Sequence, residues 1–244
     1  MKHKFFLIAC SLLFATMVFA QENNETSIPL IGDDAPTFTA ETTKGTLHFP
    51  EDYGKKWKII FSHPHDFTPV CSSELLELAY LQNDFDELGV KLVIVSDDDL
   101  EFHKNWKKSL ESLSYKNREP VEIQFPLVDD KSKVIAKKYG MIHPSNPTTE
   151  YVRGVFIIDP DNKVRAISFS PMQVGRNIED IKRTVIALQT TESSAVMTPA
   201  DWQPGEDVLV PYVKSDKKGD PKVANKDDQD LYQIAWYMVF KPMN

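Results

Sequence analysis

The sequence has few glycines and cysteines and no excess of basic residues. Its 244 residues include 9 Gly, 16 Pro and 2 Cys, a composition that excludes a collagen helix, a coiled coil, a disordered chain and a disulfide-stapled scaffold. The 28 basic residues are outnumbered by 36 acidic ones, giving a formal net charge of −8. Because nucleic-acid binders neutralise phosphates with clustered Lys and Arg, we expect no nucleic-acid partner. The 41% of hydrophobic residues suffice for one packed domain with an appendage.

Long apolar runs are scarce, and one lies at the amino terminus over residues 5–19. Lys2 and Lys4 precede it and a polar stretch follows it, a pattern that predicts a secretory signal peptide at 1–20. The run is shorter than the roughly 20 apolar residues of a bilayer span, so we expect no stable membrane insertion. We therefore expect an extracytoplasmic protein, periplasmic or secreted, whose mature chain begins with a flexible leader at 21–27.

The two cysteines lie in different parts of the chain. Cys10 falls inside the expected signal peptide, at a place that also resembles a lipoprotein cleavage box and would then carry a lipid. Cleavage after residue 20 instead removes it and leaves Cys71 as the one remaining thiol. Because secreted proteins normally pair their cysteines, an unpaired Cys71 is expected to be either reactive or buried.

The chain from residue 28 onward alternates short β-branched runs with amphipathic stretches, which indicates an α/β sheet. Asn177 has the position and chemistry of a helix N-cap. The predicted strands are 58–62, 90–96, 125–128, 154–158 and 163–168, and the predicted helices are 72–88, 97–110 and 178–188.

The amino-acid composition of the chain changes after Gln189. Prolines and a glycine recur at short intervals there, and the segment 215–230 is charged and almost without apolar residues. We expect a main domain at 28–189 and a small, irregular extension at 190–244. We expect its last apolar segment, 236–240, to pack against another apolar surface, that of a partner subunit.

Cys71 lies where a strand end leads into a helix, and we expect it in the first turn of that helix. Free backbone N–H groups and the helix dipole favour a thiolate at such a place, and can lower a cysteine pKa from about 8.5 to roughly 3.5–7.5. Pro64 and Pro69 stiffen the loop, and Thr68 can present a hydroxyl beside the sulfur. These features indicate a preorganised nucleophile. A small buried hydrophobic residue is the alternative that the residues alone leave open.

The same segment resembles a known family. Pro64, Thr68 and Cys71 match the Pro-x-x-x-Thr-x-x-Cys signature of peroxiredoxins, and 61–71 is similar to the one-cysteine subfamily. Further blocks resemble this subfamily in the same order, at 127–130, 153–160, 175–177 and 198–202. The resemblance covers about 28–210. It implies a thioredoxin-like fold, a central β-sheet flanked by helices, with a small carboxy-terminal peroxiredoxin extension.

The resemblance also implies a role for each matching residue. Cys71 would be the peroxidatic nucleophile and would become a sulfenic acid. Thr68 would hydrogen-bond the peroxide, and Pro64 would shield the sulfur from solvent. Arg153 would stabilise the thiolate and the charge on the breaking O–O bond.

Three more residues match polar positions near the pocket. Glu74, one helical turn after the cysteine, would orient the arginine of the site, whereas His63 and Arg176 match without a defined role. His65 stands where an arginine is common in the subfamily, so we expect a less cationic pocket rim at neutral pH.

The implied function is that of a thiol-dependent peroxidase in antioxidant defence. It would reduce hydrogen peroxide and organic hydroperoxides to water and alcohols through a sulfenic acid, without a cofactor or a metal. Many bacterial relatives carry a resolving cysteine near the carboxy terminus, and this chain has none there. We therefore expect an external thiol reductant, either a thioredoxin-like protein or a small thiol, and a homodimer as the minimal assembly.

Two alternatives compete with this interpretation. His63 and His65 are two residues apart and share a face of an extended segment, so with Cys71 they would form a copper or zinc module. A thioredoxin-fold holdase without catalytic activity is the other alternative. The presence of Pro64, Thr68, Cys71 and Arg153 together argues against it.

Overall fold

The computed structural model describes residues 28–142, 151–213, 222–223, 230–235 and 237–243. The expected signal peptide and leader, Cys10 and most of the charged stretch at 215–230 lie outside these residues. Within them, no helix is both long and apolar enough to cross a membrane.

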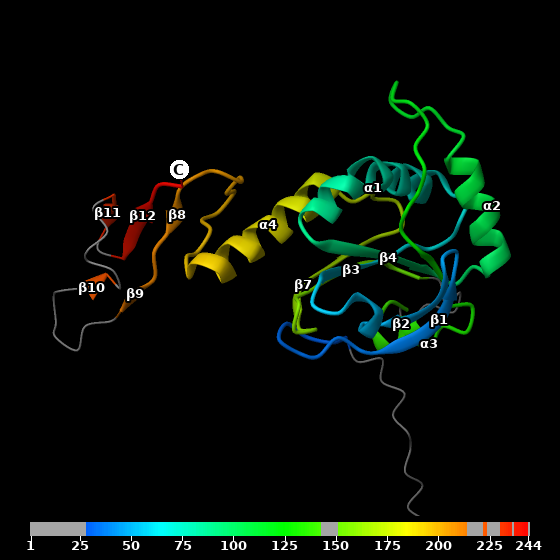
Figure 1. Cartoon of the computed structure of the whole chain (residues 1–244), viewed down its shortest axis with the longest axis horizontal. Helices are drawn as coiled ribbons and strands as arrows, with labels where there is room; N and C mark the ends of the chain where they lie inside the picture. The colour runs from blue at the N-terminus through cyan, green and yellow to red at the C-terminus, as the bar shows by residue number, and fades with distance from the viewer. Residues whose placement is uncertain (1–27, 143–150, 214–221, 224–229, 236, 244) are drawn as a thin grey trace, which may run out of the picture.

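A seven-stranded mixed sheet in the order β2-β1-β5-β4-β3-β6-β7 forms the centre of the main domain (Figure 1). Strands β3, β4 and β5 run parallel, and β6, β7, β1 and β2 complete the sheet by antiparallel pairing. The strands are β1 (Phe38–Thr42), β2 (Gly45–Phe49), β3 (Trp57–Ser62), β4 (Val90–Ser96), β5 (Leu127–Asp129), β6 (Arg153–Ile158) and β7 (Val164–Ser170). The helices are η1 (Glu51–Tyr53), α1 (Pro69–Glu87), α2 (Leu100–Leu110), α3 (Val134–Lys138) and α4 (Ile178–Ser194).

The central strands are buried on both faces, because successive side chains of a strand point to opposite sides. Ile59 and Phe61 of β3 pack under α1, α2 and α4 in one apolar cluster. Ile60, between them, belongs to a second cluster on the other face, with α3 and the β1–β2 hairpin. The expected thioredoxin-like α/β fold is confirmed.

Most predicted elements are present, with shifted ends. Helix α1 begins at Pro69, earlier than expected, and α2 begins after Asp99, whose side chain accepts a hydrogen bond from the backbone N–H of Phe102 at 2.9 Å. The predicted cap of α4 is confirmed, because Asn177 accepts from the backbone of Asp180 at 3.2 Å. The sequence analysis missed β1, β2 and α3.

The extension is more regular than expected. Strands β8 (Val208–Leu209), β11 (Tyr232–Ala235) and β12 (Met238–Lys241) form a three-stranded sheet, and β9 (Tyr212–Val213) pairs with β10 (Lys222–Val223). Figure 1 shows these strands beyond the far end of α4, which continues past Gln189 to Ser194. The expectation of an irregular appendage is thus wrong for these residues. Within the last apolar segment, residues 238–240 belong to this sheet, where the Phe240 and Tyr232 rings stack with centroids 5.2 Å apart.

Candidate active site

The loop between β3 and α1 holds Cys71 in the first turn of α1, as expected. Thr68 is the N-cap residue in an extended conformation, and Pro69 occupies the first helical turn, where its missing N–H costs no hydrogen bond. The backbone N–H of Ser72 donates to the Thr68 carbonyl at 2.9 Å. The Cys71 thiol is free, and its side chain is fully buried at 0% exposure.

Arg153 reaches the cysteine from the first residue of β6, which pairs with β3. Its Nη1 atom donates to Cys71 Sγ at 3.2 Å and to Glu74 Oε2 at 2.7 Å. Its Nε and Nη2 atoms both donate to the carbonyl of Met172, at 2.8 and 2.7 Å. These contacts fix the plane of the guanidinium, so that one N–H group stays directed at the sulfur.

Glu74 joins the two arginines of the site. Arg176 donates from Nε to Oε1 at 2.9 Å and from Nη2 to Oε2 at 2.7 Å, and its backbone N–H donates to Oε1 at 2.8 Å. Burial alone would raise the pKa of Glu74, but the hydrogen bonds and charge of Arg176, with the charge of Arg153, hold this pKa below its ordinary value. Glu74 is therefore a carboxylate that holds both guanidinium groups in place.

The Arg176 guanidinium is fixed by two further contacts. Its Nη1 atom donates to the carbonyl of Gly154 at 2.9 Å, and its central carbon lies 3.3 Å from the ring centroid of Phe61. The sequence analysis named Arg176 without a defined role. The structure makes it a support for the carboxylate that contacts Arg153, because its side chain and its backbone N–H both donate to Glu74.

Pro64 and Thr68 belong to the loop between β3 and α1 that leads to Cys71. Pro64 is buried and Thr68 is half-buried. The Thr68 hydroxyl donates to the backbone carbonyl of His65 at 2.9 Å. Since its proton is engaged there, its oxygen lone pairs are the part of the hydroxyl that remains for another donor.

His63 belongs to a buried polar network that the sequence analysis missed. Its Nε2 atom lies 2.8 Å from Asp66 Oδ1, and the other Asp66 oxygen lies 2.7 Å from Nδ1 of His103. Burial lowers the pKa of His63. Burial also acts to lower the pKa of His103, but the hydrogen bond and charge of Asp66 outweigh it and raise this pKa above its ordinary value. No sequence spacing indicates the third member, because His103 lies on α2.

The alternative His63/His65/Cys71 metal set does not form among the residues that the structure describes. Among the described residues, the groups with metal-ligand spacing are His63/Asp66/Asp98 and His65/Asp97/Asp98, and neither contains Cys71. The two histidines diverge because β3 ends at Ser62 and the chain bends at Pro64, between them. The extended alternation on which that alternative rested therefore stops before His63.

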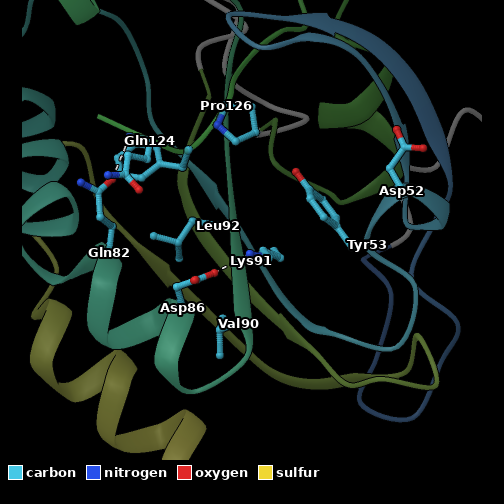
Figure 2. Close-up of a pocket in the computed structure, with 10 residues that line it drawn as sticks. Asp52, Tyr53, Gln82, Asp86, Val90, Lys91, Leu92, Gln124 and Pro126 are labelled. Atoms are coloured by element: carbon cyan, nitrogen blue, oxygen red, sulfur yellow. Dashed lines mark hydrogen bonds and ion pairs between the residues drawn. The ribbon is translucent and has the colours of Figure 1, made fainter. Parts of the chain in front are cut away.

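A separate hollow of about 490 Å³ lies by the carboxyl-terminal half of α1 and the start of β4 (Figure 2). Figure 2 shows Lys91 beside Asp86 and Gln82 beside Gln124, with Asp52 and Tyr53 set apart from them. Lys91 contacts Asp86, and the Gln82 side chain accepts from the Gln124 backbone at 2.8 Å. The hollow is lined by none of the residues around Cys71.

This site consists of a buried cysteine in the first turn of a helix and an arginine that contacts it from a neighbouring strand of a thioredoxin-like sheet. The fold and the site together place the protein in the class of thioredoxin-fold thiol enzymes. The AhpC/TSA family model matches residues 31–167, and the model of the C-terminal domain of 1-Cys peroxiredoxin matches 187–226. The chain belongs to the peroxiredoxin family, as a one-cysteine member. It is a thiol-dependent peroxidase.

Individual relatives agree over most of the chain. A peroxiredoxin of Methanosarcina mazei is 45% identical over 88% of this chain and 98% of its own. The structure of a yeast mitochondrial 1-Cys peroxiredoxin matches with a TM-score of 0.75 at 33% identity, over 88% of this chain and 100% of that chain. Peroxiredoxin 6 of Arenicola marina matches with a TM-score of 0.73 at 32% identity, over 88% and 98% of the two chains.

Proposed function

We propose that Cys71 is the peroxidatic residue. Its thiolate attacks the terminal oxygen of a peroxide, an S–O bond forms, and the O–O bond breaks with its electron pair leaving on the second oxygen. That oxygen takes up a proton and departs as water or an alcohol, and Cys71 is left as a sulfenic acid. The observation that carries this proposal is the 3.2 Å contact between Arg153 Nη1 and Cys71 Sγ.

Arg153 supplies the electrostatic part of the reaction. Glu74, Arg153 and Arg176 together carry one formal positive charge, which an anionic sulfur balances in this buried place. As the O–O bond breaks, negative charge moves onto the peroxide oxygens, and a fixed guanidinium stabilises it without reorganising. The double contact to the Met172 carbonyl provides this fixed position.

Thr68 and Pro64 complete the pocket. Since the Thr68 hydroxyl donates to a backbone carbonyl, its oxygen accepts the O–H of the bound peroxide and orients the terminal oxygen toward the sulfur. The buried Pro64 excludes water from the sulfur. Both hydrogen peroxide and organic hydroperoxides present the O–OH group that this arrangement binds, which suits an antioxidant enzyme.

An external thiol returns the sulfenic acid to the thiol. Cys71 is the one cysteine that remains if residues 1–20 are removed, so no second thiol of the mature chain can resolve it. The yeast relative is resolved via glutathione/thioredoxin systems. The reductant proposed here belongs to the same chemical classes, a small thiol or a thioredoxin-like protein.

The enzyme acts outside the cytoplasm, in a periplasm or after secretion. Support comes from the amino-terminal pattern, in which Lys2 and Lys4 precede the apolar run at 5–19. Amino-terminal sequencing of the protein from its host should begin at Gln21. A mature protein that still begins at Met1 would remove this part of the proposal.

Peroxide turnover with a panel of thiol donors tests the catalytic proposal. Wild type should consume peroxide with at least one donor. Cys71→Ser should abolish turnover while circular dichroism shows an unchanged fold, because the hydroxyl of serine is far less nucleophilic than a thiolate. Cys10→Ser is the matched control and should keep wild-type turnover. Near-normal turnover in Cys71→Ser would overturn the mechanism.

A further inference from the structure

A second cluster of ligating side chains lies at the end of β4, outside the peroxide site. His65 comes from the loop that precedes α1, and Asp97 and Asp98 directly follow β4. His65 Nδ1 lies 3.2 Å from Asp97 Oδ1 and 3.9 Å from Asp98 Oδ1. One nitrogen and two carboxylate oxygens thus lie within 4.8 Å of one another.

Each carboxylate of this cluster has one oxygen engaged by the protein and the other directed at His65. Asp98 Oδ2 accepts from the backbone N–H of Asp66 and from the hydroxyl of Ser96, each at 2.8 Å. Asp97 Oδ2 lies 3.0 Å from Nζ of Lys133. The two Oδ1 atoms are therefore the ones that face the imidazole.

Asp97 provides an independent sign that a ligand belongs here. Its side chain is 9% exposed, and its Oδ1 atom is buried and accepts no hydrogen bond. A buried carboxylate oxygen that accepts no hydrogen bond is costly, because it has lost water, and the contact it has here is the ion-pair distance of 3.2 Å to His65 Nδ1. A cation between Asp97 Oδ1 and His65 Nδ1 would satisfy it.

We propose that His65, Asp97 and Asp98 bind a divalent transition-metal ion, with zinc as the first candidate. Zinc binds imidazole nitrogen and carboxylate oxygen at about 2.0–2.2 Å, so ligand atoms around a tetrahedral ion lie about 3.3–3.6 Å apart. The separations of 3.2 and 3.9 Å bracket this range. Three protein ligands leave the fourth position to water.

The donor set also determines the class of ion. An imidazole suits zinc, copper, iron and nickel, whereas magnesium and calcium prefer sites made of oxygen alone. The two carboxylates and Lys133 carry a formal local charge of −1, which complements a divalent cation. The neighbouring His63/Asp66/Asp98 set is different, because both oxygens of Asp66 are already engaged by histidines.

A bound ion would join two segments that meet at the active site. The backbone carbonyl of His65 accepts a hydrogen bond from the hydroxyl of Thr68. The residue that would bind the metal therefore also orients the threonine proposed to bind the peroxide. Coordination by Asp97 and Asp98 would tie this loop to the end of β4. An ion that binds the folded chain and not the unfolded one raises stability in proportion to the logarithm of its concentration.

Isothermal titration and thermal unfolding test this proposal. The protein is the full chain with Cys10→Ser and Cys71→Ser, treated with a chelator, so that no thiol contributes to binding. Zinc should bind with a stoichiometry of one ion per chain and raise the unfolding temperature, and magnesium should do neither. Cobalt(II), a spectroscopic substitute for zinc, should give visible absorption bands from the bound ion.

Two ligand variants and one control decide whether this cluster is the site. His65→Asn and Asp97→Asn should each weaken zinc binding at least about tenfold, since each removes one of three ligands. The control is His48→Asn, because His48 Nδ1 also lies near a carboxylate, 3.4 Å from Asp52, but on the exposed surface; it should leave binding unchanged. Absence of saturable zinc binding, or equal loss in all three variants, would overturn the proposal and leave His65 as an ion-pair partner of the two aspartates.

Discussion

Arg153 Nη1 lies 3.2 Å from the sulfur of Cys71, although the two residues are 82 positions apart in the sequence. The contact depends on the antiparallel pairing of β3 with β6, in which Phe61 is opposite Val155. The Ser62 hydroxyl strengthens this join, accepting from the Gly154 backbone at 2.8 Å and donating to the Val152 carbonyl at 2.7 Å. The end of β3 and the start of β6 are thus fixed together at the point where the two reacting groups meet.

Removal of the guanidinium should slow the first chemical step. We expect Arg153→Ala to lower the rate of peroxide reduction by about 10²- to 10³-fold, the usual effect of losing one preorganised electrostatic contact. Stopped-flow measurement of the reaction of Cys71 with peroxide tests this. Arg165→Ala is the control, because Arg165 lies on the adjacent β7 and contacts Asp159 at 3.2 Å. A change below about threefold in Arg153→Ala would remove its assigned role.

Neutralising Glu74 should destabilise the fold as well as the site. Glu74→Gln leaves two buried guanidinium groups without their carboxylate, and breaking a buried ion pair in this way costs about 3–5 kcal/mol. Urea unfolding at neutral pH measures the loss. Glu77→Gln, one turn along α1, is the control, since Glu77 pairs with Lys116 and Arg118 near the surface and such pairs contribute about 0–1 kcal/mol. Equal losses in the two variants would contradict the assigned role of Glu74.

The contribution of Glu74 should depend on pH. Burial acts to raise the pKa of Glu74, but Arg176 and Arg153 outweigh it. The pKa of Glu74 in the folded chain is therefore lower than its ordinary value of 4.5. The folded state then binds fewer protons than the unfolded state, so the stabilisation is complete above about pH 4.5 and is lost as pH falls through the folded pKa. The difference in unfolding free energy between wild type and Glu74→Gln should therefore shrink from neutral to acidic pH. A difference that stays constant would contradict this account.

The oxidation products of Cys71 should be those of a single-thiol cycle. Equimolar peroxide should give a species that a sulfenic-acid reagent labels at Cys71, and excess peroxide should produce sulfinic acid and inactivation. Mass spectrometry of the mature chain identifies both products. Because the thiol is fully buried, non-reducing electrophoresis should show at most a minor Cys71-linked dimer. Complete conversion to a disulfide-linked dimer would refute the single-thiol cycle, and the Cys10→Ser variant would show whether Cys10 was retained.

We expect the extension to mediate a homodimer. Ile234 of β11 and Tyr237 of the turn after it are 67% and 54% exposed, and exposed apolar side chains on a small extension favour an interface. Light scattering at micromolar protein concentration should give the mass of a dimer. Ile234→Asp should shift the equilibrium toward monomer, and Leu113→Asp, at an exposed apolar position after α2, should not. A wild-type monomer, or unchanged stability on truncation at Ser215, would count against the homodimer.

The local sequence was sufficient to predict the position of the nucleophile. A buried strand, a proline-bearing loop and an amphipathic helix follow one another within 58–88, so Cys71 had to fall at a helix start. Helix caps and strand periodicity are set by neighbouring residues, which is why Asn177 was predicted correctly. The hairpin of β1 and β2 was missed although apolar and polar residues alternate in it, with Phe38 and Ala40 on one strand and Leu47 and Phe49 on the other, because each strand has only five residues. The strands of the extension are too short for any period to show.

The partners of Cys71 were decided by the tertiary structure. Strand order brings Arg153 to the sulfur, and only the family resemblance, not spacing, pointed to it from the sequence. The turn after Ser62 separates His63 from His65, placing the first with Asp66 and His103 and the second with Asp97 and Asp98. Local propensity determines the elements of this chain, whereas distances between side chains far apart in sequence depend on how the strands pair and where the loops turn.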